Sequence, residues 1–539
     1  MKKRVRDIVK DILIAEHVEY VFGHTGDNIL DLWQSIKSSS LQPIFNKTEA
    51  GAVFMADGYS RASNKIGVVL TTGGPGATNM TTGLATAYFD STPILAISGS
   101  VRVSDLGKNA FQEGSGRGRS IEQRLIFKSV CKQAMLAQSP EAVADMMFDG
   151  LRAALSGRPG PVYLEVPSNF WNIEVAYNYQ TPTQYKNLSI PNVNKDDAQV
   201  IIKQLFNSLR PIVVVGEGAL EGKNSAKEMM DVLTKINVPF CASPIGKNLV
   251  NEFNELYLGA GYDDKITHDY LRTCDFILQI GSRAPSEYFI EANSRSIKVA
   301  QVDSDPNEIG RSFPVNYSCV GSISSFLNSI PAKEHKNSTD LSRMVRRLKL
   351  GFVRSAGSTE VSGLNPLCII NIVQKLTPKN SIIVCDTGYT KARVIQEYKT
   401  TVNQLIIVSD RNGCMGFSIP AAMGAAIAQR GVVVCFCGDG GFQMSMNELG
   451  TAMNYQIKVI FIVENNGGCM SIADFNMKTY SNQCMDVFDN PDFVKIADAY
   501  EMKGYSVKNQ TQFSKFFKEA LKGNKSVLIE VNVRQSKAL

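Results

Sequence analysis

The chain has 539 residues, of which 44% are apolar and 20% are charged, the balance of an ordinary globular protein. It is too long to fold around one hydrophobic core, so about three domains are expected. The net charge of +6 comes from 57 Lys and Arg against 51 Asp and Glu. Because no long basic run accompanies this small excess, we expect no nucleic-acid partner.

The amino terminus predicts a helix rather than an export signal. Asp7, Lys10 and Asp11 interrupt the apolar core that a signal peptide needs, whereas apolar residues at helical spacing run from 5 to 13. No apolar stretch of the sequence reaches membrane-spanning length. Eleven cysteines without a C-x-x-C pair favour a reducing compartment. We therefore expect an unexported, cytoplasmic protein with no membrane partner.

Short apolar runs rich in β-branched residues alternate with helical patterns along the rest of the chain. Runs that are apolar on both faces are typical of parallel strands covered by helices on each side. In chain order they lie at 66–70, 93–97, 212–215, 276–280, 382–384, 405–408, 432–437 and 459–463. Cys435 and Cys437 lie two apart in one of these runs, so both thiols are expected on one buried face of a strand.

Two polar stretches interrupt the alternation. Residues 176–195 and 331–362 are rich in Pro, Asn, Thr and Ser and are interpreted as linkers, with a helical pattern near 341–352 in the second. They divide the chain into three α/β domains, each with a parallel sheet flanked by helices. We place these domains at residues 1–178, 192–332 and 360–539.

The run at 432–437 ends in Gly438-Asp439-Gly440-Gly441, and a helical pattern follows. Glycines at a strand-to-helix turn let backbone N–H groups approach a phosphate. A carboxylate in this turn would repel a phosphate, unless a cation lies between the two. The next strand ends in Glu464-Asn465-Asn466-Gly467-Gly468, which would place amide and carbonyl oxygens beside Asp439. Either turn alone is commonly only a loop, but together they predict a shell of hard oxygen ligands for Mg²⁺.

This pairing resembles the signature of thiamin-diphosphate enzymes, a Gly-Asp-Gly followed after one helix and one strand by Asn-Asn. The resemblance covers nearly the whole chain. It implies an N-terminal pyrimidine-binding domain, a central domain and a C-terminal diphosphate-binding domain. It also implies thiamin diphosphate and Mg²⁺ as cofactors, with the metal held by Asp439, Asn466 and the backbone of Gly468.

The same resemblance gives Glu49 a role in the N-terminal domain, where Thr48-Glu49-Ala50-Gly51 follows a strand at 43–45 and begins a helical run. In the family a glutamate here hydrogen-bonds the aminopyrimidine ring and so activates the thiazolium carbon. A glutamate at a helix start is otherwise a routine dipole or capping residue, but beside the metal motif the catalytic role is favoured. The histidine that usually precedes it is Thr48 in this chain.

Three further segments resemble acetolactate (acetohydroxyacid) synthases, namely Gly74–Asn79, Thr82–Ser91 and Ala110–Glu113. The resemblance implies that Phe111 and Gln112 face the reacting carbon of the cofactor. In the C-terminal domain Met415 takes the position of the apolar wedge that bends the cofactor, although a core methionine is the alternative. Residues expected to contact the cofactor are Gly26, Glu49, Pro75, Asn79, Tyr389, Thr390, Asn412, Met415, Gly438, Gly440, Gly441, Met470, Ser471 and Ile472.

The segments near the substrate depart from the synthases. Gly26-Asp27-Asn28 stands where they carry Gly-Gly-Ala. Asp27 resembles an aspartate of the pyruvate decarboxylases that helps to protonate the carbanion after CO₂ leaves, but the paired histidines found there are missing. Asp27 could equally cap the following helix. Phe475 stands where the synthases carry a Trp that helps to select the second oxo acid, so the choice of acceptor stays open.

The central domain could hold a nucleotide. Gly216-Glu217-Gly218 and Gly281-Ser282-Arg283 each follow a strand, and anabolic synthases bind FAD in this domain. The Phe-Asp-Asp that follows the Arg there is replaced by Ala284-Pro285-Ser286, and a Gly-x-Gly is a weak signal. FAD binding is therefore an open alternative.

The leading hypothesis for function is decarboxylation of pyruvate or another 2-oxo acid with ligation to a second carbonyl compound. A first alternative is a simple decarboxylase that protonates the same carbon with Asp27 and releases an aldehyde. A second is a non-catalytic, cofactor-binding or regulatory subunit. A nicotinamide-dependent dehydrogenase is disfavoured, because no Gly-x-Gly-x-x-Gly opens a helix. In the family the cofactor lies between two subunits, so a homodimer or homotetramer is expected.

Overall fold

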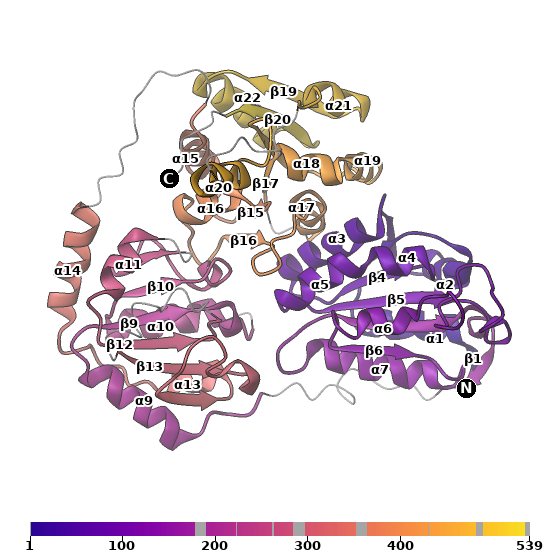
Figure 1. The fold of residues 1–539 in the computed structure, drawn as a ribbon, viewed down its shortest axis with the longest axis horizontal. Coiled ribbons are helices and arrows are strands. Elements are labelled where there is room, and N and C mark those ends of the chain that lie inside the picture. The colour runs from indigo at the N-terminus through magenta and orange to yellow at the C-terminus, as the bar shows by residue number, and fades with distance from the viewer. Residues whose placement is uncertain are drawn as a thin grey trace. The chain divides into compact units, whose positions relative to one another are not determined.

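The computed structural model describes residues 2–177, 190–222, 224–260, 264–283, 297–351, 364–428, 431–480 and 489–533. The chain forms two compact units. One consists of Met1–Leu188, Ser381–Thr390 and Ile407–Leu539, and the other of Ser189–Asn380 and Lys391–Ile406. Three six-stranded parallel sheets, one in each third of the chain, carry the fold (Figure 1).

The N-terminal sheet has the strand order β3-β2-β4-β5-β7-β6. Its strands are β2 (Tyr20–Gly23), β3 (Gln42–Phe45), β4 (Gly67–Thr71), β5 (Ile94–Ser100), β6 (Gln133–Leu136) and β7 (Val162–Pro167), and a separate antiparallel pair joins β1 (Lys2–Arg4) to β8 (Glu174–Ala176). Its helices are α1 (Val5–Ala15), α2 (Leu30–Lys37), α3 (Glu49–Ser63), α4 (Pro75–Asn79), α5 (Thr81–Phe89), α6 (Gln123–Phe127) and α7 (Ala142–Leu155), with short 3₁₀ turns at Asp27–Ile29, Val103–Asp105 and Ser168–Phe170. The apolar residues that predicted the first helix are buried along one side of α1.

The central sheet has the order β11-β10-β9-β12-β13-β14. Its strands are β9 (Pro211–Val215), β10 (Phe240–Ala242), β11 (Tyr257–Ala260), β12 (Phe276–Ile280), β13 (Lys298–Asp303) and β14 (Tyr317–Val320). The helices of this unit are α9 (Lys195–Asn207), α10 (Ser225–Ile236), α11 (Lys265–Leu271), α13 (Ile323–Ser329), α14 (Ser338–Gly351), α15 (Pro366–Leu376) and α16 (Tyr389–Glu397), the last beginning in the other unit. Helix α14 confirms the helical pattern predicted within the second polar stretch.

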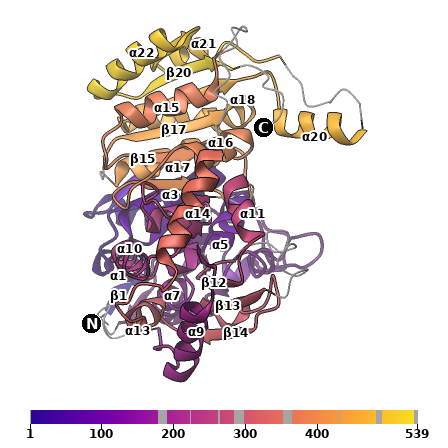
Figure 2. The same cartoon turned by 90° about the vertical axis from the view of Figure 1, so that its left-hand side faces the viewer.

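The C-terminal sheet has the order β16-β15-β17-β18-β20-β19. Its strands are β15 (Ile382–Cys385), β16 (Leu405–Val408), β17 (Val433–Gly438), β18 (Ile460–Asn465), β19 (Lys503–Val507) and β20 (Val527–Asn532). The helices are α17 (Ser418–Ile427), α18 (Asp439–Ser445), α19 (Leu449–Asn454), α20 (Met470–Tyr480), α21 (Phe493–Ala499) and α22 (Gln510–Lys522), with a 3₁₀ turn at Met446–Glu448. Figure 2 shows α20 projecting away from this sheet.

The predicted α/β class and each apolar run singled out as a strand are confirmed. Strands such as β5 and β9 are buried at every position, as expected for parallel strands covered on both faces. Cys435 and Cys437 are free thiols buried on β17. The three sheets lie inside the ranges proposed for the three domains, and the domain boundaries themselves stay a prediction. No helix among the described residues is long and apolar enough to cross a membrane.

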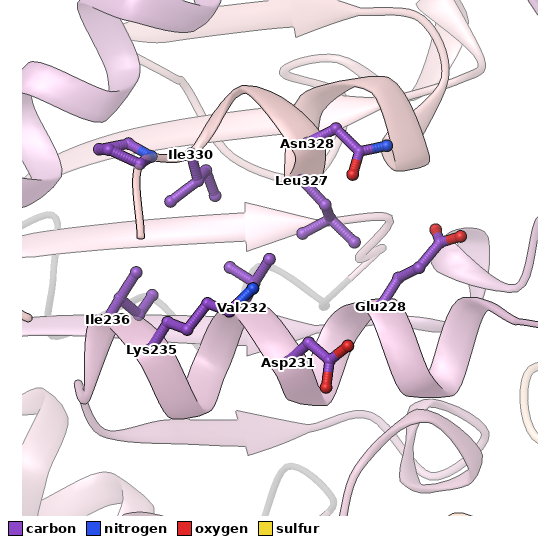
Figure 3. Close-up of a pocket in the computed structure, with 9 residues that line it drawn as sticks. Glu228, Asp231, Val232, Lys235, Ile236, Leu327, Asn328 and Ile330 are labelled. Atoms are coloured by element: carbon purple, nitrogen blue, oxygen red, sulfur yellow. The ribbon is translucent and has the colours of Figure 1, made fainter. Parts of the chain in front are cut away.

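The central unit carries a groove of about 150 Å³ between α10 and α13 (Figure 3). Charged side chains of α10, including Asp231 and Lys235, line one side of the groove, and Leu327 of α13 lies on the other. The groove therefore lies against the helices that flank the sheet. Ligands of open α/β sheets bind instead outside the carboxyl ends of the strands.

Helices α3 and α17 cross within the first unit, and glycines allow the close approach. A Cβ added at Gly424 would lie 1.9 Å from the backbone oxygen of Met55, and one added at Gly58 would lie 2.0 Å from the backbone oxygen of Ala421. Since both obstacles are backbone atoms, neither helix could accept a side chain at the crossing without moving. The crossing fixes α3, which begins at Glu49, against α17, which itself packs on β15 and β17 of the C-terminal sheet.

We expect Gly424→Ala to destabilise the protein by about 3 kcal/mol or more, because overpacking at a rigid contact displaces the backbone. The measurement is the unfolding midpoint in urea or on heating. Gly523→Ala is the matched control: its Cβ would meet only ordinary contacts, the nearest at 3.6 Å. An equal effect of the two substitutions would show that the crossing is not tightly packed.

Candidate active site

Asp439 lies at the carboxyl end of β17, where it begins α18, and its side chain is buried. Oδ2 accepts backbone N–H groups of Asn466, Gly467 and Gly468 at 2.9, 2.7 and 3.3 Å. Oδ1 accepts the N–H of Gly440 at 2.8 Å. Three consecutive N–H groups that converge on one oxygen form a concave anion site, so the loop after β18 wraps around this carboxylate.

The strand register explains why these residues meet. Gly438 of β17 pairs with Glu464 of β18, so the two strands end side by side and Asp439 and Asn466 leave the same edge of the sheet. Asn466 Oδ1 accepts the N–H of Gly468 at 3.3 Å. A carboxylate, a carboxamide oxygen and backbone carbonyls are the donors that Mg²⁺ and Ca²⁺ take in proteins, so the residues present fit a hard divalent cation.

Asp386, which follows β15, holds the neighbouring loop in place. Its carboxylate accepts N–H groups of Gly416 and Ser418, each at 3.1 Å, and the Ser418 hydroxyl at 2.8 Å. Burial raises the pKa of the Asp386 carboxyl, although these hydrogen bonds lower it in part. A Cβ on Gly441 would lie 2.8 Å from Asp386 Cγ. Glycine at 441 therefore lets α18 lie against Asp386, the residue that holds the loop carrying Met415.

Four of the predicted cofactor-binding segments converge at this edge. A Cβ added at Gly388 would lie 3.8 Å from Ser471 Oγ, and one added at Gly438 would lie 3.8 Å from Thr390 Oγ1. A Cβ on Gly416 would lie 3.7 Å from the backbone oxygen of Gly441. The loops after β15, β16, β17 and β18 thus meet, as the sequence predicts for a site at the carboxyl ends of parallel strands.

Several residues that are predicted to contact the cofactor make hydrogen bonds within the chain or are partly exposed. The Thr390 hydroxyl donates to buried Glu464 at 2.9 Å. Asn412 donates to Thr86 of α5 at 2.9 Å. Tyr389 and Met415 are half-buried, and Met470 and Ile472 lie at the start of the projecting α20, where Ile472 is 50% exposed.

Glu49 is the first residue of α3, and its side chain is 9% exposed. Thr48 caps this helix by accepting the N–H of Gly51 at 3.0 Å. Asn79 of α4 donates to Glu49 Oε2 at 3.0 Å, and a Cβ on Gly76 would lie 3.3 Å from Glu49 Oε1. Since Thr48 makes the capping contact, the Glu49 side chain is directed instead to the turn that carries Pro75 and Asn79.

Thr72, at the end of β4, connects the other predicted residues of this domain. Its Oγ1 lies 3.5 Å from Gln112 Oε1, and a Cβ on Gly26 would lie 2.4 Å from Thr72 Cβ. A Cβ on Gly76 would lie 2.8 Å from Thr72 Cγ2. Gly26, Gln112 and the turn beside Glu49 therefore surround one side chain that no motif of the sequence had marked.

Asp27 and Phe111 lie at the surface of this region. Asp27 begins a 3₁₀ turn with its side chain exposed, and it accepts no capping hydrogen bond from any described residue. The Phe111 ring is 85% exposed, and the next residue, Gln112, has a positive φ of 62°. The capping alternative for Asp27 thus has no support in the described part of the chain.

A buried polar network lies behind the Gly74 turn. Gln123 Oε1 accepts the N–H of Gly74 at 2.7 Å, and Gln123 Nε2 donates to Ser98 at 3.1 Å and to Tyr163 at 2.7 Å. Glu165 lies beside this network, and burial raises the pKa of its carboxyl from 4.5 to about 7, against the lowering by nearby hydrogen bonds and Arg124. No sequence pattern marks Glu165, because the strand that carries it is otherwise continuous and apolar.

Glu165 makes stability depend on pH. Because its pKa is raised in the folded chain, the folded state binds more protons than the unfolded one between about pH 4.5 and 7. This contribution is fully present below pH 4.5 and is lost as pH rises through 7, by about 3 kcal/mol in total. We expect Glu165→Gln to remove this slope from unfolding midpoints measured between pH 5 and 8. An unchanged slope would show that the acid is ionised in the folded protein throughout.

Glu448 connects the C-terminal domain to the start of α3. It is fully buried, and its Oε1 accepts the N–H groups of Lys47 and Thr48 at 3.0 and 3.1 Å. Its Oε2 accepts the Thr451 hydroxyl at 2.7 Å. The backbone immediately before Glu49 is therefore fixed by a carboxylate that lies some 400 positions along the chain.

In the central sheet an ion pair occupies the carboxyl ends of β9 and β12. Arg283 donates to Glu217 Oε1 from Nε at 2.9 Å and from Nη2 at 2.6 Å, and Ser243 donates to Glu217 Oε2 at 2.9 Å. Ala284-Pro285-Ser286, which replace the Phe-Asp-Asp of the FAD-binding synthases, lie outside the described residues.

These observations define the class of protein: a three-domain α/β chain whose polar sites lie at the carboxyl ends of its first and last parallel sheets. Family models match all three parts. They are the thiamine pyrophosphate enzyme N-terminal TPP binding domain at 3–117, the central domain at 198–330 and the C-terminal TPP binding domain at 386–531.

Curated relatives agree over nearly the whole length. The acetolactate synthase large subunit of Haemophilus influenzae is 31% identical, over 98% of this chain and 94% of the relative. A probable acetolactate synthase large subunit of Methanococcus aeolicus is 29% identical, over 98% of this chain and 91% of the relative. The acetolactate synthase large subunit of Lactococcus lactis is 28% identical, over 96% of this chain and 90% of the relative. The chain belongs to the family of thiamine pyrophosphate enzymes, and it is a thiamin-diphosphate-dependent enzyme similar to acetolactate synthases.

Proposed function

We propose that the protein decarboxylates a 2-oxo acid such as pyruvate and joins the remaining carbon to a second carbonyl compound. The observation that carries the proposal is the full-length similarity to acetolactate synthases combined with the cluster of Asp439, Asn466 and Gly468. Thiamin diphosphate, when bound, supplies the electron sink that lets the bond to the departing CO₂ break.

The chain's own residues take distinct parts in this proposal. Asp439, Asn466 and the Gly468 carbonyl hold Mg²⁺, which neutralises the diphosphate. Glu49 holds a proton at the pyrimidine ring, and its burial keeps water from competing for that hydrogen bond. Gln112 and Phe111 shape the pocket for the reacting carbon. In the decarboxylase alternative, Asp27 would protonate the carbon that remains after CO₂ leaves.

A site shared between two subunits is part of the proposal. Phe111 is 85% exposed in the single chain, and α20 exposes Ile472, Phe475 and Tyr480 by 50, 60 and 67%. Apolar exposure of this extent favours a further subunit over these surfaces. The expected assembly is a homodimer or homotetramer, which light scattering of the purified protein would measure.

The proposed reaction does not use FAD as a reactant. The Arg283 guanidinium is paired with Glu217 in the central sheet, so a flavin diphosphate would compete with that carboxylate for it. The visible absorbance of the purified protein checks whether it carries a flavin.

Product analysis tests the proposal. Pyruvate, thiamin diphosphate and Mg²⁺ are incubated with the protein, and the products are identified by mass spectrometry. A ligated 2-hydroxy-3-oxo acid is expected. Free aldehyde alone would favour the decarboxylase, in which case Asp27→Asn should lower aldehyde release. No conversion across a panel of 2-oxo acids, despite bound cofactor, would favour the non-catalytic alternative.

A further inference from the structure

Asn490, a residue that no motif singled out, contacts the carboxylate of the candidate metal site. Its Nδ2 donates to Asp439 Oδ2 at 2.7 Å and to Asn465 Oδ1 at 2.8 Å. Its Oδ1 accepts from Gln443 Nε2 at 2.9 Å. Asn465 in turn donates to buried Glu530 of β20 at 2.7 Å. A continuous chain of side-chain hydrogen bonds therefore runs from β20 to the Asp439 carboxylate.

These partners fix the orientation of the Asn490 carboxamide. Both hydrogens of Nδ2 have acceptors that cannot donate in return, namely a carboxylate oxygen and a carboxamide oxygen. A rotation by half a turn would place Asn490 Oδ1 against those two oxygens and its nitrogen against the Gln443 amide. Asn490 therefore presents a donor, and not an acceptor, to Asp439.

Packing holds Asn490 at this position. Asp492 begins α21 as its N-cap and accepts the N–H of Lys495 at 3.0 Å. The next residue, Phe493, is fully buried and packs edge-to-face on Phe442 of α18, with ring centroids 5.0 Å apart. Phe442 lies three residues after Asp439 and Phe493 three after Asn490, so one aromatic contact aligns both segments.

The two oxygens of Asp439 are consequently used differently. Oδ2 accepts four hydrogen bonds, three from the loop backbone and one from Asn490. Among the described residues, Oδ1 accepts only one hydrogen bond, from the backbone N–H of Gly440. A divalent cation needs an oxygen with an uncommitted lone pair. Oδ1 is the oxygen that meets this condition.

We propose that Asn490 is a positioning residue for the cation site: it engages Asp439 Oδ2 and so keeps Oδ1 directed to the metal. The inference rests on the proposed function, because it assumes that Asp439 binds the cation. Partners that orient a metal ligand commonly contribute about 10- to 100-fold to metal affinity. Asn490 acts through Asp439 and needs no contact with the metal.

The test measures Mn²⁺ affinity by electron paramagnetic resonance, with saturating thiamin diphosphate and the full-length protein. Asn490→Leu keeps the side-chain size and removes the donor, and we expect it to weaken Mn²⁺ binding about 10- to 100-fold. Gln443→Ala removes the hydrogen bond to Asn490 Oδ1 and a longer one, at 3.4 Å, to the backbone carbonyl of Asp439, and a smaller loss in the same direction is expected. Asn454→Leu, at an exposed position that ends α19, is the control and should bind as the wild type does.

The unfolding temperature of the metal-free variants separates positioning from folding. Weaker Mn²⁺ binding with an unchanged unfolding temperature, in either Asn490→Leu or Gln443→Ala, supports the inference. Wild-type Mn²⁺ affinity in Asn490→Leu overturns it. If Asn490→Leu has a lowered unfolding temperature, the Mn²⁺ affinity of Gln443→Ala is the deciding measurement. A wild-type Mn²⁺ affinity in Gln443→Ala would then also overturn the inference. A wild-type protein that binds no Mn²⁺ contradicts the proposed cation site instead.

Discussion

Replacing Glu49 with glutamine is expected to lower turnover about 10²- to 10⁴-fold, the usual contribution of a proton-transferring side chain. The glutamine keeps the shape of the residue and can still meet Asn79, which donates to Glu49 at 3.0 Å. It cannot hold an ionisable proton at the pyrimidine ring. Thiamin diphosphate affinity should therefore stay close to that of the wild type while kcat falls. Both are measured with saturating Mg²⁺.

The control for this prediction is Glu141→Gln, an exposed glutamate that precedes α7. It should leave both affinity and kcat unchanged. If Glu49→Gln kept wild-type turnover, Glu49 would be only a favourable charge at the start of α3. The proposed mechanism would then lose its activating residue.

Replacing Asp439 with alanine should abolish Mg²⁺-dependent activity. The substitution removes a charged ligand directly, so the loss in Mg²⁺ affinity should exceed the roughly 100-fold upper range for partners that only orient a ligand. It also removes the acceptor of the Asn466, Gly467 and Gly468 N–H groups, which would loosen the loop that carries the other two ligands. The measurement is turnover as a function of Mg²⁺ concentration at saturating cofactor.

Asp498→Ala, at an exposed position on α21, is the matched control and should keep the wild-type Mg²⁺ response. An Asp439→Ala protein that needs no more Mg²⁺ than the wild type would place the cation elsewhere. The inference about Asn490 would fail with it, because that inference assumes that Asp439, which accepts a hydrogen bond from Asn490, binds the cation.

Features that depend on neighbouring positions were predictable from the sequence. The run Val432–Cys437 has a strand composition whatever surrounds it, and Asp439 follows it in a glycine turn. Because adjacent parallel strands end at one edge, the pairing of Asp439 with Asn466 follows once both strands are recognised. The structure places these two residues together through the loop backbone.

Features that depend on distant contacts were not predictable from one sequence. Glu448 meets Thr48 across 400 positions and Asn490 meets Asp439 across 51, and neither residue lies in a pattern that marks it. Thr72 looks like an ordinary strand end, yet Gly26, Gly76 and Gln112 all pack around it. Asparagine and threonine are common turn residues, so their identity alone carries little information.

The substrate side was the least predictable part. Asp27 and Phe111 are exposed in the single chain, and the proposed function assigns their contacts to a substrate, a cofactor or another subunit. Residue patterns report burial and periodicity within one chain, and they do not report contacts made only in an assembly. The choice between ligation and simple decarboxylation therefore depends on product analysis.

A calorimetric titration of the purified protein with thiamin diphosphate, with and without Mg²⁺, tests the cofactor site most directly. The geometry at Asp439 and Asn466 predicts saturable binding in Mg²⁺ that is lost in a chelator and restored when Mg²⁺ is returned. Binding of equal strength with and without a divalent cation would contradict the metal site. An absence of binding under both conditions would contradict the cofactor assignment itself.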